Sequence, residues 1–432
     1  MNIIVCKLNQ GDTFEVDKSS QVLDFTNKEK YHHTFYRSLT RLYKMPKAFK
    51  KEALDLLYIS MAVYFADRRV LRDDTFDGWT RNYTLYIPVL NLAKWKTQKE
   101  HLERMVSFLS GDIWSFEFRE RSLNDTEKKV EEKIGSWFLD KKFSPDEFCM
   151  LSGGLDSFIG AIDLLSENKK IAFVGLYGGG KGVKPYQDMV NKVLQDEFSI
   201  SGDHFFNFNA TPINGNEITT RTRSFLFFTH AIILASCLDK PTTLYIPENG
   251  LISLNIPLTN TRLGSSSTRT THPYYMKMLQ SLLDNMGIEV KLKNPYQFKT
   301  KGEMLLECKK PQLIKQQYSN TMSCSHPDQV RYDKNTKPLH CGKCLPCSIR
   351  RASIIKAYSI DSTGYADGDF KKPSAKNELR SFRLGLLDYK KNKNNPLIIQ
   401  VAGPIEADYD KYHEVYKRGM NELKGFLDTI ND

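Results

Sequence analysis

A glycine turn between an apolar stretch and an amphipathic stretch constrains the fold of this 432-residue chain more than any other feature. Residues 148–151 are apolar and predict a strand, and Ser152, Gly153 and Gly154 follow at once. A helical stripe comes next, formed by Leu155, Phe158, Ile159, Ile162 and Leu165. Glycines let the backbone approach an anion, and the helix N-terminus offers free N–H groups and a positive dipole end. The sequence therefore predicts a phosphate-binding loop.

Two further residues at this turn bear on its chemistry. The hydroxyls of Ser152 and Ser157 can donate hydrogen bonds to an anion. The negative charge of Asp156 would repel phosphate, so its place is explained if it orients a Mg²⁺ ion or a loop amide. The alternative is a tight strand-to-helix turn with an acidic residue near the helix start and no ligand.

Residues 143–310 alternate between apolar strands and amphipathic helices, which predicts an α/β fold. Strands are expected at 171–177, 204–208, 243–247 and 288–293, and helices at 185–198, 224–238 and 274–286. Such alternation is typical of a parallel sheet with helices on both faces. Ligands of these folds bind at the carboxyl ends of the strands.

The flanking regions predict two further parts. Residues 1–142 suggest an α+β domain that could bind a partner, with strands at 2–7, 13–16, 84–89 and 113–118 and a helix at 48–70. The domain with the loop spans 143–358, and a C-terminal extension spans 359–432. Within that extension, residues 360–396 are expected to form an irregular connection and residues 408–430 a helix.

Four of the eight cysteines lie close together in the sequence: Cys324, Cys341, Cys344 and Cys347. Four thiolates complete a tetrahedral zinc site, which would then be closed and structural. Arg350 and Arg351 could offset its negative charge. An iron–sulfur cluster is the main alternative, since thiolates hold those clusters too.

Polar segments near the expected strand ends supply other candidates. A second glycine turn carries Lys181 and Lys184, which could face phosphate. Arg221 and Arg223 open a helix, where they could grip a phosphate or a carboxylate. Glu248 and Asn249 could read the edge of a purine-like base. Each segment could equally be an ordinary surface turn or helix start.

The overall charge and hydropathy limit the class of protein. The formal net charge is +11 with a pI of about 9.0, so nucleic acid is a possible partner, although no motif favours it. No run approaches 18 apolar residues and the start lacks the pattern of a signal peptide. We therefore expect a cytoplasmic protein without membrane segments.

The motifs together resemble the QueC family of 7-cyano-7-deazaguanine synthases over residues 145–358. The stretch from Ser152 to Ser157 matches the SGGxDS signature of PP-loop ATP pyrophosphatases, and Cys324 with Cys341-Gly-Lys-Cys344-Leu-Pro-Cys347 matches the family's zinc knuckle. The glycine turn after Tyr177 departs from the family's Tyr-Gly-Gln, and the gap before the cysteine triplet is longer.

The resemblance implies a chemistry and a set of site residues. Such enzymes cleave ATP between the α and β phosphates, adenylate 7-carboxy-7-deazaguanine, and convert it with ammonia to the amide and then the nitrile. ATP and Mg²⁺ would bind at Ser152, Gly153, Gly154, Leu155, Asp156, Ser157 and Arg223. Catalysis would involve Asp156, Ser157 and Lys301, the substrate would meet Glu248 and His272, and Zn²⁺ would be structural.

The added residues before and after this region resemble the layout of QatC, the QueC-like component of Qat anti-phage defence systems. That resemblance implies a protein partner from the same operon, to which a deazaguanine would be attached. Two other functions stay open. One is a PP-loop enzyme that thiolates tRNA, and the other is a nucleotide-sensing subunit without catalysis.

Overall fold

The structure is a computed structural model that describes residues 2–16, 19–38, 45–133, 145–178, 182–238, 240–258, 269–327 and 338–430. Its strands are β1 (Asn2–Lys7), β2 (Gln21–Asp24), β3 (Tyr31–His33), β4 (Asn82–Val89), β5 (Ile113–Glu120), β6 (Glu147–Met150), β7 (Ile171–Tyr177), β8 (Phe205–Pro212), β9 (Thr242–Tyr245) and β10 (Val290–Lys293). Its helices up to β10 are α2 (Lys51–Arg69), α3 (Leu92–Thr97), α4 (Lys99–Ser110), α5 (Asp125–Lys133), α6 (Leu155–Ser166), α7 (Lys184–Phe198), α8 (Arg223–Ala235), α9 (Gly250–Leu254) and α11 (Pro273–Met286). After β10 follow α12 (Lys301–Leu306), α13 (Pro311–Gln317), α14 (Leu345–Tyr358), α15 (Pro373–Asn392) and α16 (Tyr409–Leu427).

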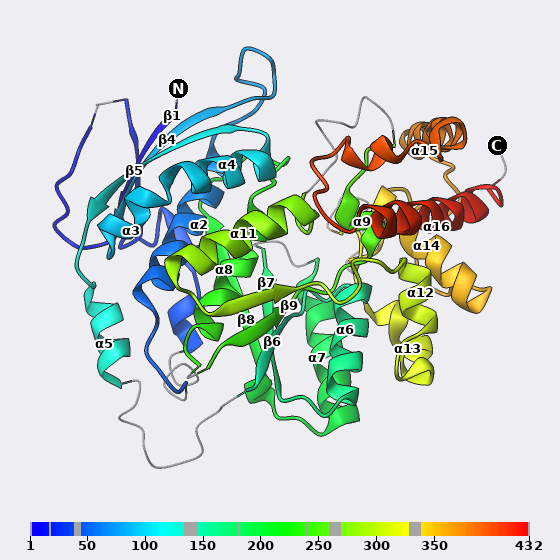
Figure 1. Ribbon diagram of the computed structural model, residues 1–432, viewed down its shortest axis with the longest axis horizontal. Helices are drawn as coiled ribbons and strands as arrows, with labels where there is room; N and C mark the ends of the chain where they lie inside the picture. The colour runs from blue at the N-terminus through cyan, green and yellow to red at the C-terminus, as the bar shows by residue number, and fades with distance from the viewer. Residues whose placement is uncertain are drawn as a thin grey trace.

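A six-stranded sheet at the centre of the molecule confirms the predicted α/β class (Figure 1). Its order is β10-β9-β6-β7-β8-β3, and every pair from β10 to β8 is parallel. From β6 the chain first adds β7 and β8 on one side of the sheet, and then returns to add β9 and β10 on the other side of β6. The direction of winding therefore reverses between β6 and β9. Doubly wound sheets bind ligands at this point, outside the carboxyl ends of the strands.

Alternate residues of the sheet point into two separate cores. Phe148 and Met150 of β6 belong to the core that contains α8 and α11. Cys149 belongs to the opposite core, where α6, α7 and α12 pack. A period of two along each strand gives this division, as the apolar runs in the sequence predict for a sheet that is covered on both faces.

The N-terminal region forms a second sheet, of four strands in the order β2-β1-β4-β5, all parallel. This is an α/β arrangement, so it differs from the α+β region that we expected. The strand expected at 13–16 was wrong, and β2 pairs with β1 instead. Asp12 explains the difference, because its carboxylate accepts the Phe14 N–H at 3.1 Å and forms a turn.

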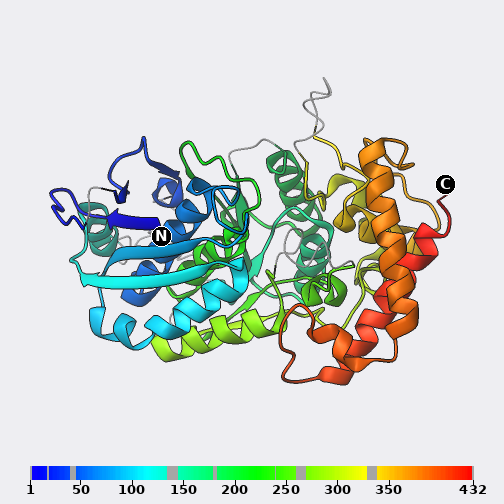
Figure 2. The ribbon, with the colours of Figure 1, turned by 90° about the horizontal axis from the view of Figure 1, so that it is seen from above.

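Helix α2 lies between the two sheets and joins them in one core. Every residue from Glu52 to Asp67 is buried, because α2 packs on α8 and β8 on one side and on β4 on the other. The short strand β3 adds to this link by pairing antiparallel with β8 at the edge of the six-stranded sheet. Figure 2 shows the N-terminal elements at one end of the molecule and α15 and α16 at the other.

Residues 373–392 form the 20-residue helix α15, so the irregular connection expected there was wrong. Charged residues conceal a buried stripe at helical spacing, made by Ala375, Leu379, Phe382 and Tyr389. This stripe packs with α14 and α16 in a third core. Among the described residues, no helix is long and apolar enough to cross a membrane.

The packing of α15 gives a stability prediction. Phe382 is fully buried, so Phe382→Ala should lower the free energy of unfolding by about 3–5 kcal/mol. Leu384 on the same helix is 58% exposed, and Leu384→Ala should change it by less than about 0.5 kcal/mol. Urea unfolding curves measure both values, and equal effects would contradict the packing described here.

Candidate functional site

The predicted phosphate loop lies at the winding reversal of the six-stranded sheet. Residues 152–154 follow β6 and lead into α6, while residues 246–249 follow β9, the strand that pairs with β6 on its other side. The two loops therefore meet at the carboxyl edge where a doubly wound sheet binds its ligand.

Hydrogen bonds within the loop fix its shape before any ligand arrives. The Ser157 hydroxyl donates to the Gly154 carbonyl at 3.0 Å and accepts the Ser152 N–H at 3.2 Å. The Ser152 hydroxyl accepts the Gly154 N–H at 3.2 Å and lies 3.1 Å from the Ser157 hydroxyl. The two serines close a ring of contacts at the N-terminus of α6, where the helix dipole favours an anion.

Gly153 cannot be replaced without rearrangement of the loop. Its φ is +83°, which favours glycine, and a Cβ atom there would lie 2.9 Å from the Gln187 side chain. The Gln187 amide donates to the Ser152 carbonyl at 3.2 Å, and the Met322 N–H donates to the Gly153 carbonyl at 2.8 Å. Gln187 and Met322 thus hold the outer side of the loop, and the sequence offered no signal for either.

Asp156 is buried and fully engaged by other protein groups. One carboxylate oxygen lies 2.7 Å from the Lys301 ammonium. The other accepts the backbone N–H of Asn249 at 3.1 Å and its side-chain amide at 2.7 Å. Of the two roles considered for Asp156, these contacts match the orientation of a loop amide.

Glu248 lies beside this network, and its pKa is shifted in the opposite direction from that of Asp156. Burial alone would raise the pKa of Asp156, but Lys301 and the hydrogen bonds outweigh it and bring that pKa to about 2. Burial and the nearby Asp156 charge raise the pKa of Glu248 well above its usual range. These opposite shifts favour the ionised form of Asp156 and the protonated form of Glu248.

Both the amide nitrogen and the carbonyl oxygen of the Asn249 side chain are hydrogen-bonded to other protein groups. Its amide N–H groups donate to Asp156 and, at 3.1 Å, to Glu248. Its carbonyl oxygen caps α9 by accepting the Ile252 N–H at 3.1 Å. The amide is therefore committed to the protein, which leaves Glu248 as the half-buried group of this pair that could face a base.

The C-terminal extension holds the helix that carries Lys301. The helix α12 starts at Lys301 with a capping box between Thr300 and Glu303. Glu303 accepts from Arg418 of α16 at 2.6 Å. Glu422 of α16 accepts from Thr300 and from Gly302. Contacts with α16 therefore set the position of the Lys301 ammonium.

Two other predicted site residues lie outside this network. Arg223 donates to the Leu176 carbonyl at the end of β7 at 3.3 Å, beside Gln187. His272 caps α11, where its Nδ1 accepts the Tyr274 N–H at 3.2 Å, and its ring contacts Phe108. Within the described chain, His272 makes no hydrogen bond to Asp156, Glu248 or Lys301.

The prediction for Lys181 cannot be compared with the structure, because residues 179–181 and 259–268 lie outside the described residues. Lys184, the other lysine of the second glycine turn, forms an ion pair with Asp188.

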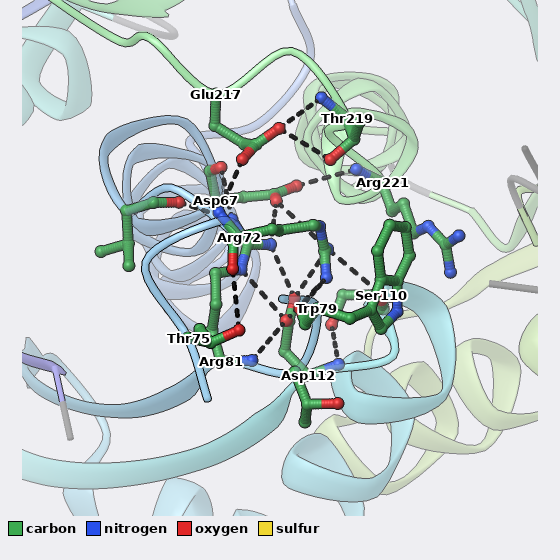
Figure 3. Close-up of polar contacts among 12 residues, drawn as sticks. Asp67, Arg72, Thr75, Trp79, Arg81, Ser110, Asp112, Glu217, Thr219 and Arg221 are labelled. Carbon is green, nitrogen blue, oxygen red and sulfur yellow. Dashed lines mark hydrogen bonds and ion pairs between the residues drawn. The ribbon is translucent and has the colours of Figure 1, made fainter. Parts of the chain in front are cut away.

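A buried ionic cluster fixes the start of α8 to the N-terminal region (Figure 3). Asp67 of α2 accepts the backbone N–H groups of Arg221 and Thr222 at 2.8 and 2.9 Å. The same carboxylate pairs with Arg81 at 2.6 Å, and Arg81 also pairs with Asp112. The side chain of Arg221 stacks on Trp79, with its guanidinium 4.7 Å from the ring centre. Arg221, which precedes α8 of the six-stranded sheet, therefore contacts the N-terminal region through both its backbone and its side chain.

The four clustered cysteines could hold a metal ion such as zinc. Their sulfur atoms all lie within 4.8 Å of one another, and the pairs Cys324–Cys344 and Cys341–Cys347 are 3.9 Å apart. A tetrahedron with Zn–S bonds of about 2.3 Å has edges of about 3.8 Å, so the four thiols fit zinc. Gly342, with a φ of +81°, makes the tight turn between two ligands.

The cysteine cluster is linked to the phosphate loop through Ser323. The Ser323 hydroxyl accepts the Leu155 N–H at 3.3 Å. The backbone N–H of Ser323 donates to Nε2 of His340 at 3.2 Å. Arg350 is fully buried and donates to Thr321 at 2.8 Å and to Ser323 at 3.4 Å. Arg350 therefore braces this link, and Arg351 stacks on Phe426 and donates to the Gly368 carbonyl. The charge of Arg351 also interacts with Cys347, and the offset of thiolate charge by the two arginines stays a prediction.

No model of a known protein family matches the chain, and no curated protein matches it.

The cysteine cluster gives a prediction about metal removal. Cys344→Ser should lose one equivalent of zinc and lower the unfolding temperature by on the order of 10 °C, because metal binding and folding are coupled. Elemental analysis and thermal unfolding measure the two effects.

The matched control is Cys308→Ala, which changes a buried cysteine outside the cluster. That variant should keep its zinc. Full zinc occupancy in Cys344→Ser would show that the cluster is not a four-thiolate site.

Proposed function

We propose that this chain is an ATP-dependent enzyme of the QueC type that adenylates the carboxyl group of a 7-deazaguanine and converts it to an amide or nitrile. We propose further that it acts as the QatC component of an anti-phage system, with a partner protein. The observation that carries the proposal is the SGGxDS loop at the winding reversal of a doubly wound sheet, with Asp156 bound to Lys301 and Asn249.

The loop would serve the departing pyrophosphate. A carboxylate oxygen of the substrate attacks the α-phosphorus of ATP, and the bond to the β-phosphate oxygen breaks. The negative charge that develops on pyrophosphate would meet the N-terminus of α6 and the hydroxyls of Ser152 and Ser157. Because the loop is already held by Gln187 and Met322, little reorganisation opposes this step.

Lys301 would contact the adenylate, and Glu248 would contact the base. The ammonium of Lys301 is fixed by Asp156 and could stabilise negative charge on the adenylate. Burial and the nearby Asp156 charge raise the pKa of Glu248, and in its protonated form this carboxyl could both donate to and accept from the edge of a guanine-like base. Ammonia then displaces AMP from the activated carboxyl to give the amide, and a second activation removes water to give the nitrile.

The proposal includes two metal ions with different tasks. A Mg²⁺ ion would enter with ATP and be held by the phosphates, because both oxygens of Asp156 already have protein partners, and it would neutralise charge on pyrophosphate. A Zn²⁺ ion held by Cys324, Cys341, Cys344 and Cys347 would be structural, because four thiolates leave no open position.

The thiolation alternative is weakened by the remaining cysteines. A sulfur carrier needs an accessible thiol with a low pKa. Cys6, Cys149, Cys237 and Cys308 are all buried, and burial raises the pKa of each thiol, to about 12 for Cys6 and Cys308. Visible absorbance typical of an iron–sulfur cluster would favour thiolation again.

The direct test is an assay of the purified chain with ATP, Mg²⁺, ammonium and 7-carboxy-7-deazaguanine. Mass spectrometry should detect AMP together with the amide or nitrile of the base. ATP binding without AMP formation, in the presence of the substrate and of the proteins encoded beside this one, would favour the nucleotide-sensing alternative.

The Asp156 network gives a prediction about turnover. Asp156→Asn should reduce AMP formation by at least about 100-fold, because the amide cannot hold the Lys301 ammonium in place. The isosteric change keeps one oxygen acceptor for Asn249, so the circular dichroism spectrum should stay that of the folded protein. Asp188→Asn, on the exposed side of α7, is the control and should keep full activity. Normal AMP production by Asp156→Asn would refute the role assigned to Asp156.

A further inference from the structure

A cavity lies in the N-terminal region, far along the chain from the phosphate loop. It has a volume of about 550 Å³. Its walls come from the segments that follow β1, β2 and β5, all strands of the four-stranded parallel sheet, together with β3 and α2. The cavity therefore lies at the carboxyl edge of a parallel sheet, which is the edge where such sheets bind ligands.

Aromatic rings form one wall of this cavity. The ring of Phe25 lies 5.4 Å from that of Tyr31 and 5.3 Å from that of Tyr58. The hydroxyls of Tyr58 and Tyr36 are 3.2 Å apart. Clustered aromatic side chains offer both apolar area and ring edges, which suits a planar ligand.

Three residues of the lining carry buried polar atoms that have no hydrogen-bond partner. They are the hydroxyl of Tyr31, the side-chain oxygen of Asn9 and Nδ1 of His33. Tyr31 is only 1% exposed, so its unpaired hydroxyl is costly to the folded protein unless a ligand binds it. Burial lowers the pKa of His33 to about 4, so this ring is neutral at pH 7 and can accept or donate.

Positive charge gathers at the rim. Lys28, Arg37 and Lys128 line the cavity with exposed side chains, against the single carboxylate of Asp125. Neither lysine forms an ion pair with the described part of the chain. The rim can therefore attract an anion that is joined to whatever occupies the aromatic interior.

We propose that this cavity is a second ligand site, which binds an anionic planar heterocycle of the nucleotide class. The heterocycle packs against Phe25 and Tyr58, and Tyr31 with Asn9 supplies a donor and an acceptor for its edge. Lys28 and Lys128 bind its phosphate. None of these residues belongs to the loop after β6, so this proposal stands independently of the adenylation proposed above.

The test uses the full chain with GMP and AMP as probes. Hydrogen exchange should slow in residues 8–10, 25–37 and 122–128 when nucleotide is added, and calorimetry gives the affinity. Tyr31→Phe removes only the hydroxyl and should weaken binding by about threefold to tenfold. Its unfolding temperature without nucleotide should be equal or higher, because an unpaired buried hydroxyl is lost.

Two further variants complete the design. Lys28→Ala with Lys128→Ala changes exposed side chains only, and should weaken binding about tenfold and reduce its salt dependence. Tyr86→Phe, on the same sheet but outside the lining, should bind as the unchanged protein does. Guanosine and inorganic phosphate should each bind more weakly than GMP.

The proposal is overturned if the three segments show no protection by either nucleotide. It is equally overturned if the affinity for nucleotide is unchanged by both the Tyr31→Phe change and the double lysine change. Guanosine that binds as tightly as GMP would remove the role of the rim and refute the anionic part of the ligand.

Discussion

The buried charge of Asp156 is the constraint on which the site depends. A carboxylate in the interior must be paired, and loss of one partner typically costs about 3–5 kcal/mol. Asp156 meets this need with Lys301 from α12 and Asn249 from the loop after β9. Because each partner comes from a different part of the chain, the charge can be satisfied only when all three segments are assembled. The phosphate loop and its surroundings are therefore fixed together.

Contacts from other parts of the chain hold the segments that surround Asp156. The cysteine cluster braces Ser323 and Met322 against the phosphate loop through His340 and Arg350. Farther from Asp156, Asp67 of the buried helix α2 holds Arg221 and Thr222, the two residues before α8. The helix α16 sets the position of α12. The C-terminal extension thus contributes to the geometry of the site.

Local patterns explain what the sequence could predict. The continuous apolar run of β7 and the 3.6-residue period in α6 are visible within a few residues, and so are the Ser152–Ser157 turn and the cysteine spacing. Pairings between distant segments are not visible in this way. The edge strand β3 has three residues, and the stripe of α15 is hidden among charges. Gln187 and Ser323 carry no motif, so their contacts with the loop needed the structure.

The most direct measurement of the central claim follows one oxygen atom. The purified chain would be given ATP, Mg²⁺, ammonium and 7-carboxy-7-deazaguanine labelled with ¹⁸O in its carboxyl group, and the AMP would be analysed by mass spectrometry. If the substrate carboxylate attacks the α-phosphorus, the released AMP carries one ¹⁸O atom. Unlabelled AMP, or ADP in its place, would contradict adenylation of this carboxyl group.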